Sequence, residues 1–155
     1  MADRTQVAID GSQRSGEHNH GSHDAIAPAT PGASNMPIVD VCTVMPDASP
    51  LPAGTAKALA NAIAAVFNVG EGRVWLRLQV LPQSHYAENG PGEDPSPVFV
   101  KVIHADLKPA EQLAQEAMAL TQAVAACLGR NAEFIHVEYA PAGRGRMAFG
   151  GNLVH

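Results

Sequence analysis

The chain has 155 residues, a formal net charge of −5 and only 16% charged residues. This length predicts one main domain, and the sparse, acidic charge argues against a surface that binds nucleic acid through its phosphates. The sequence shows no basic-then-apolar leader and no apolar run long enough to span a bilayer, so we expect a cytoplasmic protein without a membrane partner.

Residues 1–35 are predicted to form a disordered, polar, His-containing tail. This stretch is rich in Gly, Ser, His, Asn and Asp, and it contains too little apolar surface to offset the entropy cost of ordering. Its His18, His20 and His23 could chelate a divalent ion, although a solvated extension is the stronger interpretation. Alternatively, the stretch is removed, or it is never translated because synthesis starts at Met36. Residues 36–155 form the predicted domain.

From Met36 onward the pattern predicts a βαβ unit. A strand covers residues 38–44, directly after Pro37, and Thr55 is the expected N-cap of a helix. That helix carries apolar residues at helical spacing, and Gly70 and Gly72 are expected to end it. A second strand, residues 74–81, alternates between an apolar face and a face that bears Trp75, Arg77 and Gln79.

A second unit follows a loop rich in proline and glycine that covers residues 82–97. A strand is predicted over residues 97–103, again opened by a proline. Pro109 suits the first turn of a helix that Gly129 closes, and a fourth strand is predicted over residues 134–139. The four glycines between residues 143 and 151 suit a hairpin or a closely packed cover.

The two units repeat each other in order and spacing, because Pro37 and Pro97 each open a strand and the segment 75–82 parallels the segment 134–141. We therefore predict an α+β fold in which two βαβ repeats form a four-stranded mixed sheet with both helices on one face. The other face, which bears Trp75, Arg77, Phe134 and His136, would lie open in a monomer. Another subunit is its natural cover, so we expect a closed symmetric oligomer.

Three features together resemble one known family. They are the strand-opening Met36-Pro37, the two βαβ repeats, and a glycine-rich end that finishes in Phe149-Gly150-Gly151-Asn152-Leu153. In combination they resemble the tautomerase superfamily, the group of 4-oxalocrotonate tautomerase and macrophage migration inhibitory factor. The resemblance covers residue 36 to the C-terminus. It implies a homotrimer with sites between neighbouring subunits and an N-terminal proline as the catalytic base.

The resemblance also implies roles for individual residues. Pro37 takes the place of the catalytic base, and Arg77, with His136 as its counterpart in the second repeat, falls where the single-repeat enzymes carry an arginine that polarises the substrate. Met147 falls where those enzymes carry an apolar phenylalanine near the proline. One position departs from the family, because the arginine that binds a substrate carboxylate is matched by Asp47 in the first repeat and by Leu107, beside Lys108, in the second. A dicarboxylate substrate is therefore in doubt.

The chemistry fits these residues on physical grounds. An apolar pocket and a nearby cation both disfavour the protonated form of a secondary amine, so a free Pro37 amine can act as a general base in keto–enol tautomerisation of a small 2-keto acid. Arg77 can meet the developing enolate oxygen, and Arg144 or Arg146 can bind a substrate carboxylate as a bidentate fork. This chemistry requires no metal and no organic cofactor.

Each assignment has an alternative. Arg77 and His136 could be subunit contacts, and Arg144 and Arg146 could be solvated loop charges. If the chain keeps residues 1–35, the nitrogen of Pro37 is an amide without a basic lone pair, and the protein is a catalytically silent trimeric binding module of the same fold. Dehalogenation or decarboxylation of a three-carbon acid ranks below isomerisation, because no acidic residue is clearly placed to activate a water.

Overall fold

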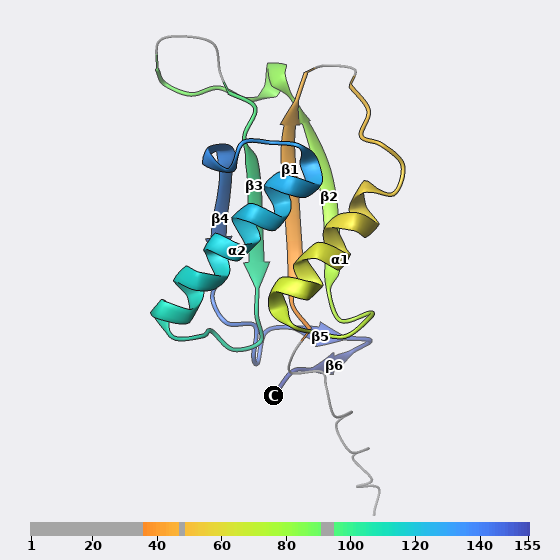
Figure 1. The fold of residues 1–155 in the computed structure, drawn as a ribbon. Helices are drawn as coiled ribbons and strands as arrows, with labels where there is room; N and C mark the ends of the chain where they lie inside the picture. Colours follow the sequence, from red (N-terminus) through yellow and green to blue (C-terminus); the bar gives the residue numbers. More distant parts are fainter. Residues whose placement is uncertain (1–35, 47–48, 91–94) are drawn as a thin grey trace, which may run out of the picture.

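The protein is described by a computed structural model that covers residues 36–46, 49–90 and 95–155. The predicted tail and Asp47 lie outside the described residues. The elements in chain order are β1 (Ile38–Met45), α1 (Thr55–Phe67), β2 (Trp75–Pro82), η2 (Gln83–His85), β3 (Val98–Ile103), α2 (Ala110–Leu128), η3 (Ala132–Phe134), β4 (Ile135–Tyr139), β5 (Ala148–Phe149) and β6 (Asn152–Leu153) (Figure 1).

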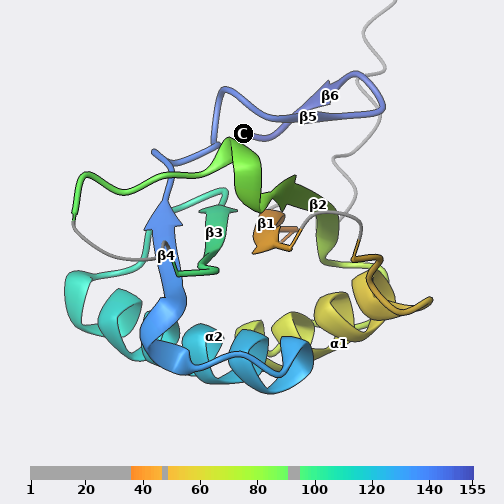
Figure 2. The ribbon, with the colours of Figure 1, turned by 90° about the horizontal axis from the view of Figure 1, so that it is seen from above.

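The main sheet is four-stranded and mixed, with the order β2-β1-β3-β4. Each repeat contributes one parallel pair, β1 with β2 and β3 with β4, and the two pairs meet where β1 runs antiparallel to β3. Both helices cover the same face of the sheet (Figure 2). The predicted arrangement of two βαβ units with two helices on one face is confirmed.

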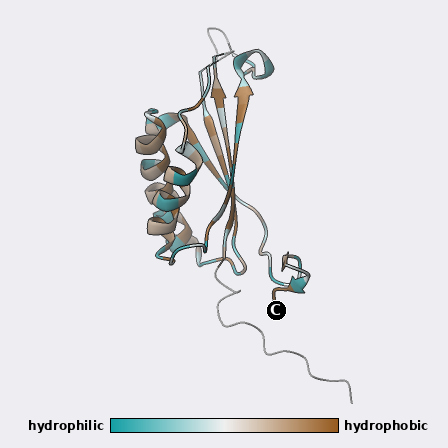
Figure 3. Cartoon of the chain, turned by 90° about the vertical axis from the view of Figure 1, so that its right-hand side faces the viewer, coloured by the Kyte–Doolittle hydropathy of each residue, from teal (hydrophilic) through white to brown (hydrophobic). Residues whose placement is uncertain are grey.

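The core lies between this sheet and the two helices. In β1, Val39 and Val41 are fully buried toward the helices, whereas Ile38, Asp40 and Cys42 alternate onto the other face. The remaining buried members of the core come from the helices and from β3 and β4: Leu59, Ile63, Phe67, Val98, Val100, Val102, Leu120, Val124, Ala125 and Ile135. In side view the helices lie on one side of the sheet, and the C-terminal segment lies beyond one end on the other side (Figure 3).

Two predicted helix ends are wrong by a few residues, for identifiable reasons. Gly54, in the left-handed region at φ 86°, precedes α1, and Thr55 is the first helical residue; its hydroxyl donates back to the Pro52 carbonyl at 2.7 Å instead of capping the helix. Asn68, not Gly70, ends α1 with a left-handed φ of 52°. Gly129 closes α2 as predicted, with φ 62°.

The strand ends also differ slightly from the prediction. β2 begins at Trp75, one residue later than expected, and Phe134 belongs to η3 and not to β4. Pro109 directly precedes α2 and is its N-cap.

The glycine-rich end does form a hairpin, in which β5 and β6 pair antiparallel and Gly150 and Gly151 take positive φ values of 57° and 86°. The hairpin lies on the side of the sheet away from the helices (Figure 2).

We expect Leu120→Ala to lower the free energy of unfolding by about 2–5 kcal/mol, because it removes a fully buried side chain from the centre of the core. Met118 lies on the same helix but is 66% exposed, so Met118→Ala is the matched control and should cost less than about 0.5 kcal/mol. Urea unfolding followed by circular dichroism measures both. Equal losses in the two variants would contradict this placement of the core.

Candidate functional site

A pocket of about 350 Å³ lies at the end of the sheet where β1 and β2 begin, and Pro37 is not among its described lining residues. Its lining consists of Ile38, Trp75, Leu76 and Arg77. The parallel register places Ile38 opposite Trp75, and the backbone N–H of Trp75 donates to the carbonyl of Pro37 at 3.1 Å. Because Ile38 directly follows Pro37, the pocket and the proline share one corner of the sheet. The side chain of Pro37 is fully buried.

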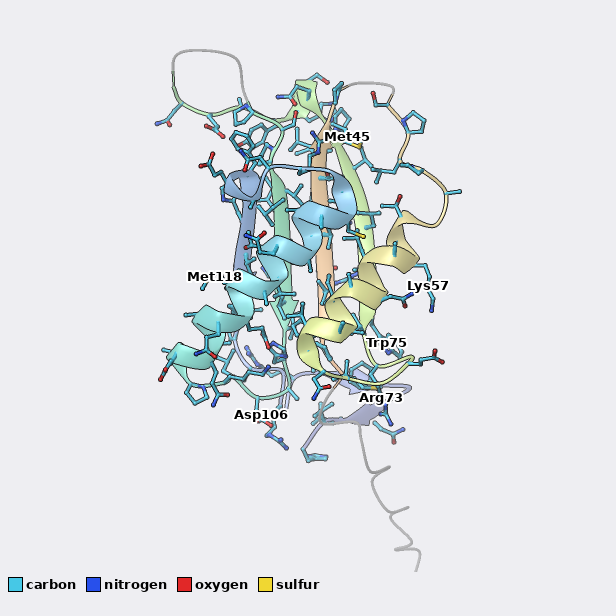
Figure 4. All side chains as sticks on the ribbon, viewed as in Figure 1. Met45, Lys57, Arg73, Trp75, Asp106 and Met118 are labelled. Atoms are coloured by element: carbon cyan, nitrogen blue, oxygen red, sulfur yellow. The ribbon has the colours of Figure 1, made fainter. Side chains whose placement is uncertain are left out.

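The C-terminal segment covers this corner. Phe149 of β5 meets the indole of Trp75 edge to face, with the ring centroids 5.1 Å apart. Met147 is buried in a small apolar cluster with Ala105 and Val154, against which Ile38, Ile103 and Phe149 pack. Met147 therefore lies in the cluster that Ile38 borders. Trp75 and the terminal hairpin appear together at the lower end of β2 in Figure 4.

Gly143 sets the path of this covering segment. Its N–H donates to the carbonyl of His104 at 2.8 Å. A Cβ at residue 143 would come within 2.6 Å of three side-chain atoms of Met147, so no other amino acid fits without displacing that side chain. The hairpin can therefore return close to the end of β3 because residue 143 is glycine.

Arg77 projects from β2 on the face away from the helices, and Asp40 of β1 holds it in a bidentate ion pair. Its Nε donates to Oδ1 of Asp40 at 2.5 Å, and its Nη2 donates to Oδ2 at 2.8 Å. The hydrogen bonds and the charge of Asp40 raise the pKa of Arg77 above its ordinary value. The carboxylate partner of Arg77 therefore comes from its own chain, a partner that the sequence analysis did not anticipate.

The ion pair belongs to a row of alternating charges across the sheet. The registers place Arg77 opposite Asp40, Asp40 opposite Lys101, and Lys101 opposite Glu138. Lys101 and Glu138 form a second ion pair, with Nζ and Oε1 3.2 Å apart. Both pairs are substantially exposed, so solvent screening keeps their contribution to stability small. Their importance lies in the electrostatics of the face that carries the pocket.

His136 occupies the place in the second repeat that Arg77 occupies in the first. In the parallel pairs, Val39 lies opposite Leu76 in the first repeat and Val98 lies opposite Ile135 in the second. The next residue along each strand corresponds in the same way. Phe99 thus takes the place of Asp40, and the rings of Phe99 and His136 lie 5.6 Å apart. Tyr86, from the segment after η2, adds a third ring 6.0 Å from Phe99. An aromatic cluster replaces the ion pair in the second repeat.

Arg144 and Arg146 are occupied within the terminal segment. Nε of Arg144 donates to Oδ1 of Asp106 at 2.6 Å, and its Nη1 donates to the carbonyl of His155. The hydrogen bond from Arg144 lowers the pKa of Asp106. Nε of Arg146 donates to the carbonyl of Ala142 at 3.0 Å. Neither arginine is among the lining residues of the pocket, so the structure does not bring them together with Arg77 there.

A buried polar cluster lies on the other side of the sheet, and the sequence analysis missed it. Glu116 accepts a hydrogen bond from Nε2 of His104 at 2.7 Å and another from Lys108, and the ring of Tyr139 stacks on His104 at 6.0 Å. Burial raises the pKa of Glu116, but the hydrogen bonds from Lys108 and His104 outweigh it, so the net shift is downward. The sequence did contain one signal of this cluster, because Glu116 places a carboxylate on the apolar stripe of α2, between Leu113 and Leu120.

This cluster ties the ends of β3 and β4 to the body of α2. His104 follows β3, Glu116 lies in α2, and Tyr139 ends β4, and the carbonyl of His104 also accepts the N–H of Gly143. The cluster therefore supports the segment that covers the pocket without lining the pocket itself. Within the residues that the structure describes, no group of three or more His, Cys, Asp and Glu side chains is placed to hold a metal ion.

Comparisons with known proteins identify the fold. A fused 4-OT described as a symmetric trimer is 22% identical, covers 76% of this chain and 94% of its own, and superposes with a TM-score of 0.62. Macrophage migration inhibitory factor from Oncomelania hupensis is 18% identical, with 77% and 83% covered and a TM-score of 0.60. A malonate semialdehyde decarboxylase inhibited by 3-bromopropiolate is 17% identical, with 73% and 90% covered and a TM-score of 0.55.

These neighbours are proteins of the tautomerase superfamily, so the chain has the tautomerase fold, and the predicted resemblance is confirmed at the level of architecture. No model of a known protein family matches the sequence, and no curated protein matches it either. At these identities the likeness establishes the fold alone. Among the described residues, no helix has the length and apolar character needed to cross a membrane.

We expect Glu116→Gln to lower the free energy of unfolding by about 1–3 kcal/mol at pH 7, because it removes a buried charge that the buried His104 and the partly exposed Lys108 contact. The folded-state pKa of Glu116 lies below its ordinary value, so its contribution is present above the unfolded-state pKa and is lost as the pH falls through the folded-state value. The difference between wild type and variant should therefore shrink in acid. Urea unfolding at pH 7 and at several acidic pH values measures it.

Glu111→Gln is the matched control, since Glu111 is an exposed acid in the first turn of the same helix. It should change stability by less than about 1 kcal/mol. If Glu116→Gln and Glu111→Gln behaved alike at every pH, the assignment of Glu116 as a buried, paired carboxylate would be wrong.

Proposed function

We propose that the domain is a tautomerase that moves a proton between carbon and oxygen of a small 2-keto acid, with the free amine of Pro37 as general base. The observation that carries this proposal is the pocket that begins at Ile38, the residue after Pro37; its described lining consists of three apolar side chains and one arginine. A volume of about 350 Å³ is in the range of small-molecule sites. The tautomerase fold of the chain supports the same reading.

The lining determines what the amine can do. Ile38, Trp75 and Leu76 offer no hydrogen bond from their side chains to a protonated amine, so they disfavour its charged form and leave a lone pair that can accept a proton. The amine takes a proton from the carbon next to the ketone, and the C–H electron pair moves to form the enolate. Pro37 then returns the proton to the oxygen or to another carbon, so the reaction is an isomerisation without net change of atoms.

Arg77 stabilises the enolate oxygen in this mechanism. Asp40 holds the Nε and Nη2 edge of its guanidinium, and the remaining N–H groups are left for a substrate oxygen. A donor that is already fixed before the reaction costs no reorganisation in the transition state. The proposal needs neither a metal ion nor an organic cofactor. Met147 shapes the apolar cover. His136 is assigned to substrate binding from the resemblance, and Arg144 and Arg146 are assigned to it because a guanidinium can bind a carboxylate as a bidentate fork.

We also propose that the protein works as a homotrimer. The sheet face away from the helices exposes large side chains, with Trp75 at 51% and Phe99 at 39%. The fused 4-OT that shares the fold is described as a symmetric trimer. Burial of this face between copies would remove that apolar surface from water. A particle mass three times that of the chain in light scattering would support the trimer, and a monomer at working concentration would contradict it.

The second candidate function is a catalytically silent binding module. In the 155-residue sequence the nitrogen of Pro37 forms a peptide bond with Met36, and an amide nitrogen has no basic lone pair. The intact mass of the protein purified from its native host separates the two candidates. A chain that starts at Pro37 supports the enzyme, and a chain that keeps residues 1–35 supports the module.

We expect a chain that starts at Pro37 to ketonise the enol of phenylpyruvate about 10²–10⁴ times faster than the same chain with Met36 retained, because only the first has a free amine. Absorbance of the enol follows the reaction. The Pro37→Ala variant of the short chain should lose activity and keep the oligomeric state of the parent. Equal turnover with Met36 retained would remove the proline from the mechanism.

Arg77→Ala in the short chain should lower kcat by about 10²-fold, because the enolate loses a fixed donor. Lys57→Ala is the control, since Lys57 is an exposed cation on α1, on the opposite side of the sheet. It should leave kcat unchanged. If the two variants lost activity equally, a general effect of net charge would replace the proposed role of Arg77.

A further inference from the structure

Asp40 engages Arg77, the one charged side chain among the described residues that line the pocket. Arg77 lines the pocket, and both carboxylate oxygens of Asp40 accept hydrogen bonds from its Nε and Nη2. Within the described residues, Nη1 of Arg77 donates to no protein group. Asp40 therefore fixes the Nε and Nη2 edge of the guanidinium and leaves Nη1 for a ligand.

Asp40 also cancels the charge of this arginine. The pair carries no net charge, and the next pair in the row, Lys101 with Glu138, is neutral as well. A ligand in the pocket therefore meets an arginine that can donate hydrogen bonds but has little excess positive potential. The other three lining residues, Ile38, Trp75 and Leu76, are apolar. Such a site suits a ligand with a single carboxylate and an apolar remainder better than one with two carboxylates.

We propose that Asp40 is a specificity-determining residue that holds Arg77 in place and, by neutralising it, selects keto acids with one carboxylate over those with two. This inference rests on the proposed function for its substrate class, and it adds a residue that acts through Arg77 without touching the substrate. The second repeat offers an internal contrast. Phe99 stands in the place of Asp40 there, and His136 in the place of Arg77, so the same position carries no ion pair.

The test compares two five-carbon ligands, 2-oxopentanoate and 2-oxoglutarate, which differ by one terminal carboxylate. Trp75 is the only tryptophan of the chain and lines the pocket, so its single indole N–H signal in ¹H–¹⁵N spectra reports binding without turnover. The titrations use the 155-residue chain. Asp40→Asn keeps an acceptor of the same shape beside Arg77 and removes the negative charge. Glu138→Gln is the matched control, because it removes the other acid of the row, which pairs with Lys101.

We expect wild type to bind 2-oxopentanoate at least as tightly as 2-oxoglutarate, and Asp40→Asn to shift the ratio of the two Kd values toward 2-oxoglutarate by about fivefold. The shift should diminish at high salt, because an uncompensated exposed charge is screened. Glu138→Gln should move the ratio by less than about twofold. A change that weakened the fold alone would affect both ligands equally and leave the ratio unmoved.

Three results would overturn the inference. They are an unchanged ratio in Asp40→Asn, an equal shift in Glu138→Gln, and the absence of binding of both acids to wild type and to Asp40→Asn. Binding to the 155-residue chain does not require a free amine at Pro37. If the Kd ratio shifts but the short chain is inactive, the proposed isomerisation is rejected and the role of Asp40 stands. If the short chain is active but the Kd ratio does not shift, only the role of Asp40 is rejected.

Discussion

The parallel pairing of β1 with β2 is the constraint on which the site depends. Two parallel strands begin at the same end of a sheet, so the register that sets Ile38 opposite Trp75 brings the start of β1 to the first residues of β2. The same register sets Asp40 opposite Arg77. A shift of one residue would turn Arg77 toward the helices and remove it from the face that carries the pocket. The apolar side chains of β2 oppose such a shift, because it would take Leu76 and Leu78 away from the core against which they pack.

Most of the fold could be predicted from the sequence because the apolar spacing changes cleanly from strand to helix. The alternation of apolar and polar residues in β2 predicted the sheet, and the apolar stripe from Leu59 to Phe67 predicted the helix layer. The recurrence of similar patterns further along the chain predicted the repeat. The helix ends could not be placed as well. Left-handed backbone is expected at glycine, yet Asn68 takes that conformation and ends α1 before Gly70 is reached. Which residue adopts a left-handed φ depends on where packing ends, and local composition does not specify it.

The site was predictable only in part. Pro37, Trp75 and Arg77 were singled out along the chain; the structure places Trp75 and Arg77 in one pocket with Ile38, whereas Pro37 does not line that pocket. Asp40 was not anticipated as the partner of Arg77. The two residues are 37 positions apart in the sequence, and only the register of the strands brings them together. Glu116 was missed for another reason. Its spacing placed a carboxylate on an apolar stripe, but only the fold shows that His104 and Lys108 reach it there.

The two repeats differ in chemistry on the sheet face away from the helices, whereas their buried positions are alike. Their buried positions correspond closely, since Val39 matches Val98 and Leu76 matches Ile135, and both pairs serve the same core. On the opposite face the ion pair of Asp40 and Arg77 corresponds to the ring pair of Phe99 and His136. Packing tolerates little change in a close-packed interior, whereas an exposed face can exchange charge for aromatic surface at small cost in stability. Equivalent backbone positions thus carry a cation that lines a pocket in the first repeat and an aromatic cluster in the second. The duplicated fold therefore presents two chemically different surfaces on one face of the sheet.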